Sequence, residues 1–213
     1  GGTISGGTFA PSDSTFLVIT SNSSNRLSGV TVNGDLDLSA SSARLRISNG
    51  LTLNGTAHMS GRNAAISFDG TQSFDSGTIA FEGITGSTRD VTIEGTATLT
   101  VGAGATIRGG RGNIGSQFFV GGNNALINQG TILSDVSGQA ITIQSDSFTN
   151  QGGAQASGGS TLNIAATNWS NAGGTLATTN STLNLGGTFT TANVGTVSNT
   201  GGTVNLTGTL NNV

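Results

Sequence analysis

The C-terminal end of the chain reads TLNIAATNWSNAGGTLATTNS at 161–181, then TLNLGGTFTTANVGTVSNTGG at 182–202, then TVNLTGTLNNV at 203–213. Each stretch opens on Thr and an apolar-polar-apolar triplet, so the triplets lie at 162–164, 183–185 and 204–206 with equal spacing. Side chains alternate between the two sides of a β-strand, so the outer residues of each triplet share one side. A fixed period of about 21 residues is the sequence signature of a solenoid, in which each coil buries its apolar side chains against the next.

The same spacing continues toward the N-terminus. Nearly equal steps lead to apolar or closely related triplets at 141–143, 120–122, 99–101, 79–81, 57–59 and 36–38. The main exception is Gly122, which has no side chain at a position where the pattern expects an inward apolar one. A second apolar series follows the triplets and includes Ile84, Phe148, Trp169 and Phe189. A third series, which includes Leu176, lies just before each triplet. Three apolar series per period predict three strands per coil.

The chain is therefore predicted to be an all-β, right-handed parallel β-helix (a solenoid) with three strands per coil, about 21 residues per coil and about nine or ten coils. Strands in neighbouring coils pair at roughly 4.8 Å. One continuous segment is expected over 1–213, excised from a larger repetitive protein. The composition agrees, because 36 Gly, one Pro, two Glu and no Lys leave little from which to build an α-helix.

Composition and charge also exclude several classes of protein. Only 8% of the residues are charged, but the regularly spaced branched apolar residues argue against a disordered chain. The net charge is -3 and the seven arginines are spread along the first half, so we expect no nucleic-acid partner. No apolar run is long enough to span a bilayer, so we expect no membrane insertion by this segment. The absence of Cys excludes disulfides and thiolate metal sites.

Asn and Gly recur at one predicted turn of the coil. Asn128, Asn150 and Asn171 each begin an Asn-x-Gly turn and follow one another at nearly equal steps. Gly and Asn tolerate the left-handed backbone conformation, and an Asn amide can hydrogen-bond the same amide one coil away. We therefore expect a ladder of Asn side chains at this turn. Coil lengths vary most at 82–92 and 108–118, where loops are expected.

Several stretches resemble the repeats of filamentous-haemagglutinin-like exoproteins and of autotransporter passenger domains. They are Asn-Gln-Gly-Thr-Ile at 128–132, the Thr-Leu-Asn stretches of 161–164 and 182–185, and Thr-Gly-Thr-Leu-Asn-Asn at 207–212. The resemblance covers most of the chain and implies a secreted or surface-anchored bacterial β-helix that serves as an adhesive stalk. The Asn-Pro-Asn motifs of the two-partner secretion domain are missing, since Pro11 is the only proline. The resemblance therefore indicates interior repeat.

Parallel β-helices also include polysaccharide lyases and hydrolases, whose chemistry needs clustered carboxylates on one outer face. The densest charged group here is Glu82, Arg89, Asp90 and Glu94. One interpretation is an acid/base pair, and the one we favour is a set of solvated side chains on a loop. His58 has no second His with which to form a metal site or a catalytic triad, so we expect an exposed bystander. No catalytic residue, metal site or cofactor is predicted.

The outward residues of the three C-terminal triplets form a flat, uncharged polar strip. Its members are Thr161, Asn163, Thr182, Asn184, Thr203 and Asn205. This polar strip is the candidate binding face for a glycan or for ice, and the alternative that we favour is a simple solvated face. Trp169 is in phase with inward apolar residues, which predicts a buried aromatic stack and not a sugar-binding ring.

The sequence thus predicts a non-enzymatic structural stalk or adhesive segment of a large secreted or cell-surface bacterial protein, acting by rigid presentation or surface contact. The expected partner is a glycan or protein of a host or neighbouring cell. Residues 147–213 carry no charged side chain, and their terminal coil edge could stack end to end on another copy. The alternative function is a carbohydrate-active β-helix, either a polysaccharide lyase or hydrolase or a glycan-binding module.

Overall fold

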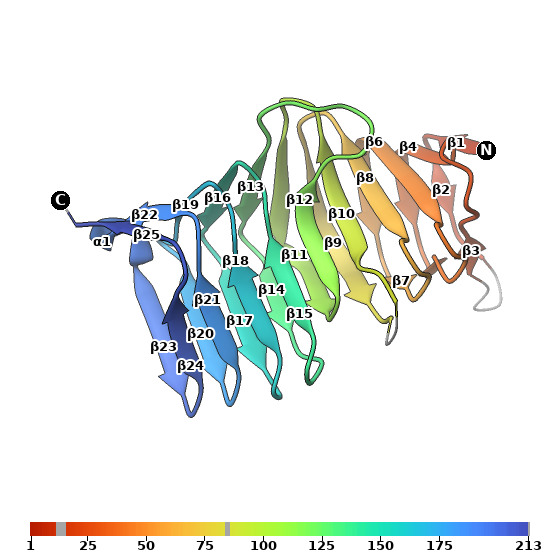
Figure 1. The fold of residues 1–213 in the computed structure, drawn as a ribbon. Helices are drawn as coiled ribbons and strands as arrows, with labels where there is room; N and C mark the ends of the chain where they lie inside the picture. Colours follow the sequence, from red (N-terminus) through yellow and green to blue (C-terminus); the bar gives the residue numbers. More distant parts are fainter. Residues whose placement is uncertain (12–15, 84–85, 213) are drawn as a thin grey trace.

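The computed structural model describes residues 1–11, 16–83 and 86–212. The chain forms an all-β parallel solenoid of about nine turns, with about 22 residues per turn (Figure 1). The pairings between described strands are parallel and join one turn to the next. Within the described ranges the only helix is α1 (Thr191–Val194), a single short turn. The prediction of an all-β parallel solenoid is therefore confirmed.

The strands fall into three parallel series, which we call face 1, face 2 and face 3. Face 1 contains β1 (Thr3–Ser5), the first parts of β4 (Arg26–Val32) and β6 (Arg44–Leu53), β8 (Ala65–Asp69), β10 (Arg89–Glu94), β12 (Gly112–Ser116), β15 (Ala140–Ile143), β18 (Thr161–Ile164), β21 (Thr182–Leu185) and β24 (Thr203–Leu206). Face 2 contains β2 (Thr8–Phe9), the second parts of β4 and β6, the first parts of β9 (Gln72–Phe81) and β11 (Thr98–Gly109), β13 (Ala125–Asn128), β16 (Ser147–Asn150), β19 (Asn168–Ser170), β22 (Thr188–Thr190) and β25 (Thr209–Asn211). Face 3 contains β3 (Leu17–Val18), β5 (Leu36–Asp37), β7 (Thr56–Met59), the second parts of β9 and β11, β14 (Thr131–Ser134), β17 (Gly153–Ser157), β20 (Thr175–Thr179) and β23 (Thr196–Thr200).

The core is a column of apolar side chains that runs along the interior of the solenoid. On face 1 the inward partners of successive coils are Ile66, Val91, Ile114, Ile143 and Ile164, each at most 1% exposed. Every such side chain rests on its equivalent one coil away, and its burial contributes about 1.5–3 kcal/mol. Stacking in register is therefore what makes such short strands stable.

A constant step does not hold through the middle of the chain. Ile114 pairs with Ile143 on the next coil, although the interval between them is clearly longer than one C-terminal repeat. Counting along the chain by the length of one C-terminal repeat therefore leads from a strand on one face to a strand on another face. The triplet at 79–81 lies on face 3, the triplet at 99–101 on face 2 and the triplet at 141–143 on face 1. The predicted triplet series is therefore right over 36–81 and again over 141–206, and wrong as one continuous ladder through the middle of the chain.

The longest coil contains an excursion at 117–124, between β12 and β13, which we call the strap. Val120, predicted as a rung of an apolar ladder, lies in the strap and is 51% exposed. The last part of the loop expected at 82–92 is strand, because β10 begins at Arg89. Within the loop expected at 108–118, residues 108–109 belong to β11 and residues 112–116 form β12. Ile84, assigned to the second apolar series, lies outside the described residues.

The corner between face 2 and face 3 carries the predicted Asn ladder. Asn128 Nδ2 donates to Asn150 Oδ1 at 2.7 Å, and Asn150 Nδ2 donates to Asn171 Oδ1 at 2.7 Å. All three side chains are fully buried. A Cβ on Gly152 at the same corner would lie 2.3 Å from the carbonyl oxygen of Gly130, so the turn has no room for a larger residue. The predicted ladder is confirmed.

Candidate functional site

The predicted polar strip lies on the outward side of face 1. Its residues stack in register as Thr161, Thr182 and Thr203 and as Asn163, Asn184 and Asn205. Asn205 Nδ2 donates to Asn184 Oδ1 at 2.9 Å, and Asn184 Nδ2 donates to Asn163 Oδ1 at 2.7 Å. The strip therefore has the predicted alignment, and a second Asn ladder holds its side chains in place.

The polar strip offers hydrogen bonds without charge. Asn163 also donates to Thr142 Oγ1 at 3.1 Å, which extends the ladder by one coil. An Asn amide has two N–H groups and two oxygen lone pairs, so a ladder position such as Asn184 keeps donor and acceptor capacity for a ligand or water. A shallow depression beside the ladder is lined by Asn184, Gly186 and Thr207. Sugar hydroxyl groups are the ligand chemistry that fits such a surface.

The predicted charged cluster does not form one solvated loop. Arg89, Asp90 and Glu94 lie on β10 and are only 2%, 6% and 3% exposed. Two nitrogens of the Arg89 guanidinium donate to backbone carbonyl oxygens at 2.8 Å. Glu82 directly follows β9 on face 3, away from the other two carboxylates on face 1. The interpretation as solvated loop side chains is therefore wrong for the three residues of β10.

Glu82 contacts His58 on face 3. His58 Nδ1 lies 2.8 Å from Glu82 Oε1, and His58 Nε2 lies 3.6 Å from Asp35 Oδ2. Burial lowers the pKa of His58, but the hydrogen bond and charge of Glu82 and the charge of Asp35 outweigh burial, so the pKa is raised above its usual value. The interpretation of His58 as a bystander is wrong, because it links carboxylates of the preceding and following coils.

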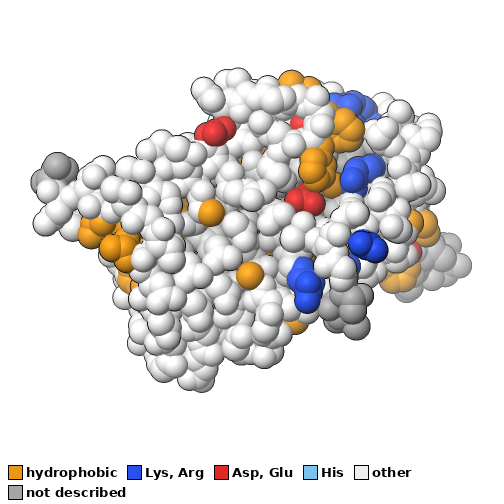
Figure 2. Space-filling model, viewed as in Figure 1, with side chains coloured by type: hydrophobic (Ala, Val, Ile, Leu, Met, Phe, Trp, Pro, Cys, Tyr) orange, Lys and Arg blue, Asp and Glu red, His pale blue; other side chains and the backbone are white. Residues whose placement is uncertain are grey.

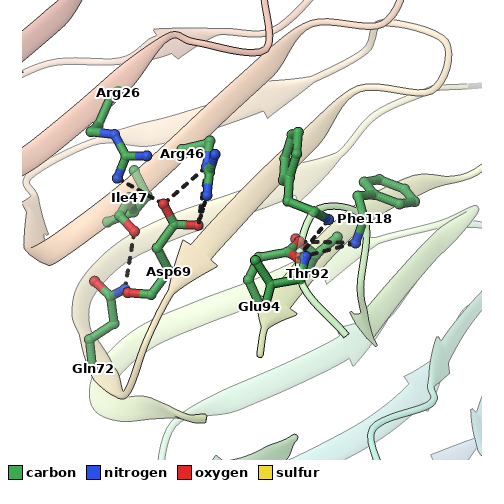
Figure 3. A network of polar contacts seen from close by, with 10 residues as sticks. Arg26, Arg46, Ile47, Asp69, Gln72, Thr92, Glu94 and Phe118 are labelled. Carbon is green, nitrogen blue, oxygen red and sulfur yellow. Dashed lines mark hydrogen bonds and ion pairs between the residues drawn. The ribbon is translucent and has the colours of Figure 1, made fainter. Parts of the chain in front are cut away.

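Glu94 fixes the strap to face 1, as Figure 3 shows. Its carboxylate accepts the backbone N–H groups of Phe118, Phe119 and Val120 at 2.8 to 3.3 Å and the hydroxyl of Thr92 at 2.6 Å. Burial raises the pKa of Glu94, but the hydrogen bonds from Thr92 and from the three amides outweigh burial and hold the pKa below its usual value. Glu94 is therefore an ionised anchor of the strap.

The strap covers the outward side of face 1. Ser67 on β8 and Thr92 on β10 lie on the outward side of their strands, yet they are 1% and 0% exposed. Gln117 Nε2 donates to a backbone carbonyl oxygen at 2.9 Å at the start of the strap. Asn124 Nδ2 donates to two carbonyl oxygens at 2.7 and 3.1 Å at its end. The strap is thus fixed at both ends as well as at its middle.

The strap presents aromatic side chains over arginines. The Phe118 ring centroid lies 5.2 Å from the guanidinium carbon of Arg44, and the Phe119 centroid lies 4.5 Å from that of Arg46. Phe118, Phe119 and Val120 nevertheless remain 47%, 37% and 51% exposed. Figure 2 shows hydrophobic and basic side chains together on this part of the surface. Contiguous exposed apolar side chains of this kind mark interaction sites.

Asp90 is a buried carboxyl of face 1 whose pKa is raised above its usual value. Burial raises its pKa, and hydrogen bonds from Asn113 and Ser116 together with the charge of Arg44 offset only part of that rise. Asn113 Nδ2 donates to Asp90 Oδ1 at 3.0 Å. A buried carboxyl with a raised pKa beside an arginine is the feature of this site that comes nearest to an acid/base group.

The strap is not predicted from the sequence, although one signal marks it. Phe118, Phe119 and Val120 are three consecutive apolar residues, which breaks the alternation that a strand with one buried side requires. Gly121 and Gly122 follow directly. An apolar run that cannot have all its side chains inside, ended by two glycines, indicates a projecting loop.

Trp169 is part of the interior, as predicted. It is 2% exposed, and its ring centroid lies 4.3 Å from that of Phe189 on the next coil of face 2. Trp169 Nε1 donates to the carbonyl oxygen of Gly186 at 2.8 Å, which satisfies the only polar group of the indole. The ring is therefore not a surface for stacking a sugar.

Comparison of the chain with protein-family models, with curated proteins and with solved structures finds no match. Among the residues that the structure describes, no helix combines the length and the apolar character that a membrane crossing needs. In the same ranges no group of three or more His, Asp or Glu residues is placed to hold a metal ion. The polar strip and the strap are the two surface features that offer groups to a ligand or partner.

Proposed function

We propose that this chain is a structural, non-enzymatic segment of a large secreted or outer-surface bacterial protein, where it works as a rigid stalk that presents an adhesive surface. The observation that carries this function is the stacking of about nine turns in register. A solenoid gains its stability from contacts between neighbouring coils, so a long in-register stack forms an extended, stiff support. The resemblance to haemagglutinin-like exoproteins and autotransporter passengers adds the secreted or cell-surface location.

The use of the polar side chains supports a structural role. Buried Asn128 and Asn150 donate to their equivalents one coil later. Glu94, which sequence reasoning considered for acid/base chemistry, has its oxygens occupied by the strap and by Thr92. Glu82 is engaged with His58. These groups hold the fold together and leave little capacity for a reacting substrate.

The polar strip is the proposed adhesive surface, with a glycan of a host or neighbouring cell as its ligand. Asn184→Tyr places a large ring in the middle of the strip, and Thr149→Tyr places the same ring outward on face 2 as a matched control. On a glycan array we expect the wild type and Thr149→Tyr to bind the same glycans and Asn184→Tyr to lose at least about tenfold in affinity, roughly 1.4 kcal/mol. Equal glycan binding by all three chains would show that the polar strip is not the binding surface.

The second candidate is a carbohydrate-active β-helix, and the raised pKa of buried Asp90 beside Arg44 is the observation that favours it. A reducing-sugar assay on neutral and acidic polysaccharides tests it with the wild type, Glu82→Gln and Asp90→Asn. We expect no new reducing ends from any of the three chains. Cleavage by the wild type that either substitution abolishes would replace the structural role with an enzymatic one.

A further inference from the structure

The first surface of interest is centred on the strap, and we call it the aromatic-basic patch. It consists of Phe118, Phe119 and Val120 of the strap with Arg26, Arg44 and Arg46 of face 1. The carboxylates next to it are withdrawn from solvent. Asp69 bridges Arg26 and Arg46 at 2.8 and 2.9 Å, and its side chain is only 16% exposed (Figure 3). Because Asp90 and Glu94 are also buried, the accessible charge of this patch is positive.

The second surface lies on face 3, and we call it the acidic-apolar patch. It consists of Phe16, Val18, Asp35, Asp37 and Glu82. Phe16 and Val18 are 48% and 59% exposed, and the side chains of Asp35 and Glu82 are 39% and 43% exposed. Asp35 and Glu82 contact the imidazole of His58, and Asp37 is the register partner of His58 on the preceding coil. Three carboxylates outnumber the one imidazole, so the accessible charge of this patch is negative.

The two patches contain most of the apolar surface that the described part of the chain exposes. Among the described residues, seven large hydrophobic side chains are exposed, and five of these seven belong to the two patches. The other two, Leu206 and Leu210, lie on the last coil, where residues 147–213 carry no charge. Both patches therefore combine an apolar centre with charge, and their charges are opposite in sign.

We propose that the aromatic-basic patch of one molecule binds the acidic-apolar patch of a second copy of this chain. The patches lie on different faces of a rigid solenoid, so they cannot meet within one molecule. Opposite charges on the two surfaces favour the encounter and fix its register, while burial of the exposed rings supplies affinity. A contact between two different surfaces is heterologous, so each copy keeps one free patch and assembly continues into a ring or a filament. This contact does not depend on whether the polar strip binds a glycan.

Sedimentation velocity of the full chain and of three variants tests this contact. Phe118→Ser with Phe119→Ser removes the centre of the aromatic-basic patch, and Phe16→Ser with Val18→Ser removes the centre of the acidic-apolar patch. Leu206→Ser removes an apolar side chain that is 61% exposed and lies outside both patches, and it is the control. Far-UV circular dichroism and urea midpoints confirm that each variant folds, as expected for substitutions of exposed side chains.

We expect the wild type and the Leu206→Ser control to assemble with rising concentration, and each double variant to stay monomeric. An equal mixture of the two double variants should give a dimer and nothing larger, because each supplies the patch that the other lacks. High salt should weaken assembly of the wild type. A wild type that stays monomeric up to roughly 1 mM contradicts the proposal. A mixture that stays monomeric also contradicts it, and loss of assembly only in Leu206→Ser assigns the contact to end-to-end stacking instead.

Discussion

Replacing Glu94 by Gln is the perturbation that most sharply isolates the role of the strap. Gln has the shape of Glu, so the side chain keeps its place under the strap while its charge is lost. The backbone N–H groups of Phe118, Phe119 and Val120 then face a neutral amide in place of the carboxylate that now accepts them at 2.8 to 3.3 Å. We expect the strap to open more often, while the stacked coils beneath it stay folded.

The size of the effect follows from the hydrogen bonds. A hydrogen bond to a charged group contributes about 1.5–3 kcal/mol, and a neutral one contributes about 0.5–1.5 kcal/mol. Weakening three such bonds by about 1 kcal/mol each lowers the free energy of opening the strap by about 3 kcal/mol. Since about 1.4 kcal/mol corresponds to a factor of ten, the three amides should exchange hydrogen roughly 100-fold faster. Global unfolding also breaks these three bonds, so its free energy should fall by a similar amount, about 3 kcal/mol, whereas amides elsewhere that exchange through openings that leave the strap closed should be unaffected.

Native-state hydrogen exchange, resolved at single amides, measures this opening directly. Asp135→Asn is the matched control, because it removes a carboxylate that pairs with Arg108 on face 3, whereas the strap lies over face 1. Lowering the pH should open the strap in the same way as the substitution, because protonation also removes the charge of Glu94. The pKa of Glu94 is held below its usual 4.5, so its stabilisation is present above pH 4.5 and is lost as the pH falls through the lower folded value. Unchanged exchange of the three amides in Glu94→Gln, or equally accelerated exchange of these amides in Asp135→Asn, would refute the role assigned to Glu94.

Three further outcomes are expected. Asn150→Ala removes the acceptor of one Asn128 Nδ2 bond and the donor to Asn171 Oδ1 inside the buried ladder, so urea denaturation should show a loss of about 2–4 kcal/mol. Trp169→Ala removes a buried ring and should lower the free energy of unfolding by about 3–5 kcal/mol, and the wild-type indole should resist aqueous fluorescence quenchers because it is 2% exposed. The pKa of His58 is raised above its usual 6.5. The stability that His58 contributes is therefore fully present below pH 6.5 and is lost as the pH rises through the folded value. Urea midpoints of the wild type should fall across that pH range, and those of His58→Gln should not show this fall.

The solenoid was predictable from the sequence because its cause is local and repeated. The triplets at 162–164, 183–185 and 204–206 recur at the interval of one coil, and alternation alone sends their outer residues inside. The Asn ladder was predictable for the same reason, since equal spacing brings equal side chains together. A period read from the regular C-terminal half therefore indicated the fold class.

The route of the chain through the middle of the solenoid was not predictable from the period. An insertion such as the strap changes the length of a coil without changing the pattern of its strands. Ile143 therefore pairs with Ile114 on face 1, although a constant step back from Ile143 points to Gly122 in the strap. The burial of Asp90 and Glu94 was hidden for the same reason. Their positions on β10 are outward. The strap, which comes later in the sequence, covers Glu94, and Asn113 and Ser116 of the next coil contact Asp90.

Successive coils stay in register on face 1, and the strap is left outside the stack. Because the chain contains no Cys, paired cysteine substitutions can test this register by disulfide formation under mild oxidation. Asn113 and Thr142 are register partners on face 1, so Asn113→Cys with Thr142→Cys should cross-link as readily as Thr142→Cys with Asn163→Cys. A constant step would place Gly121 beside Thr142 instead. Cross-linking of Gly121→Cys with Thr142→Cys, and none between 113 and 142, would contradict the account.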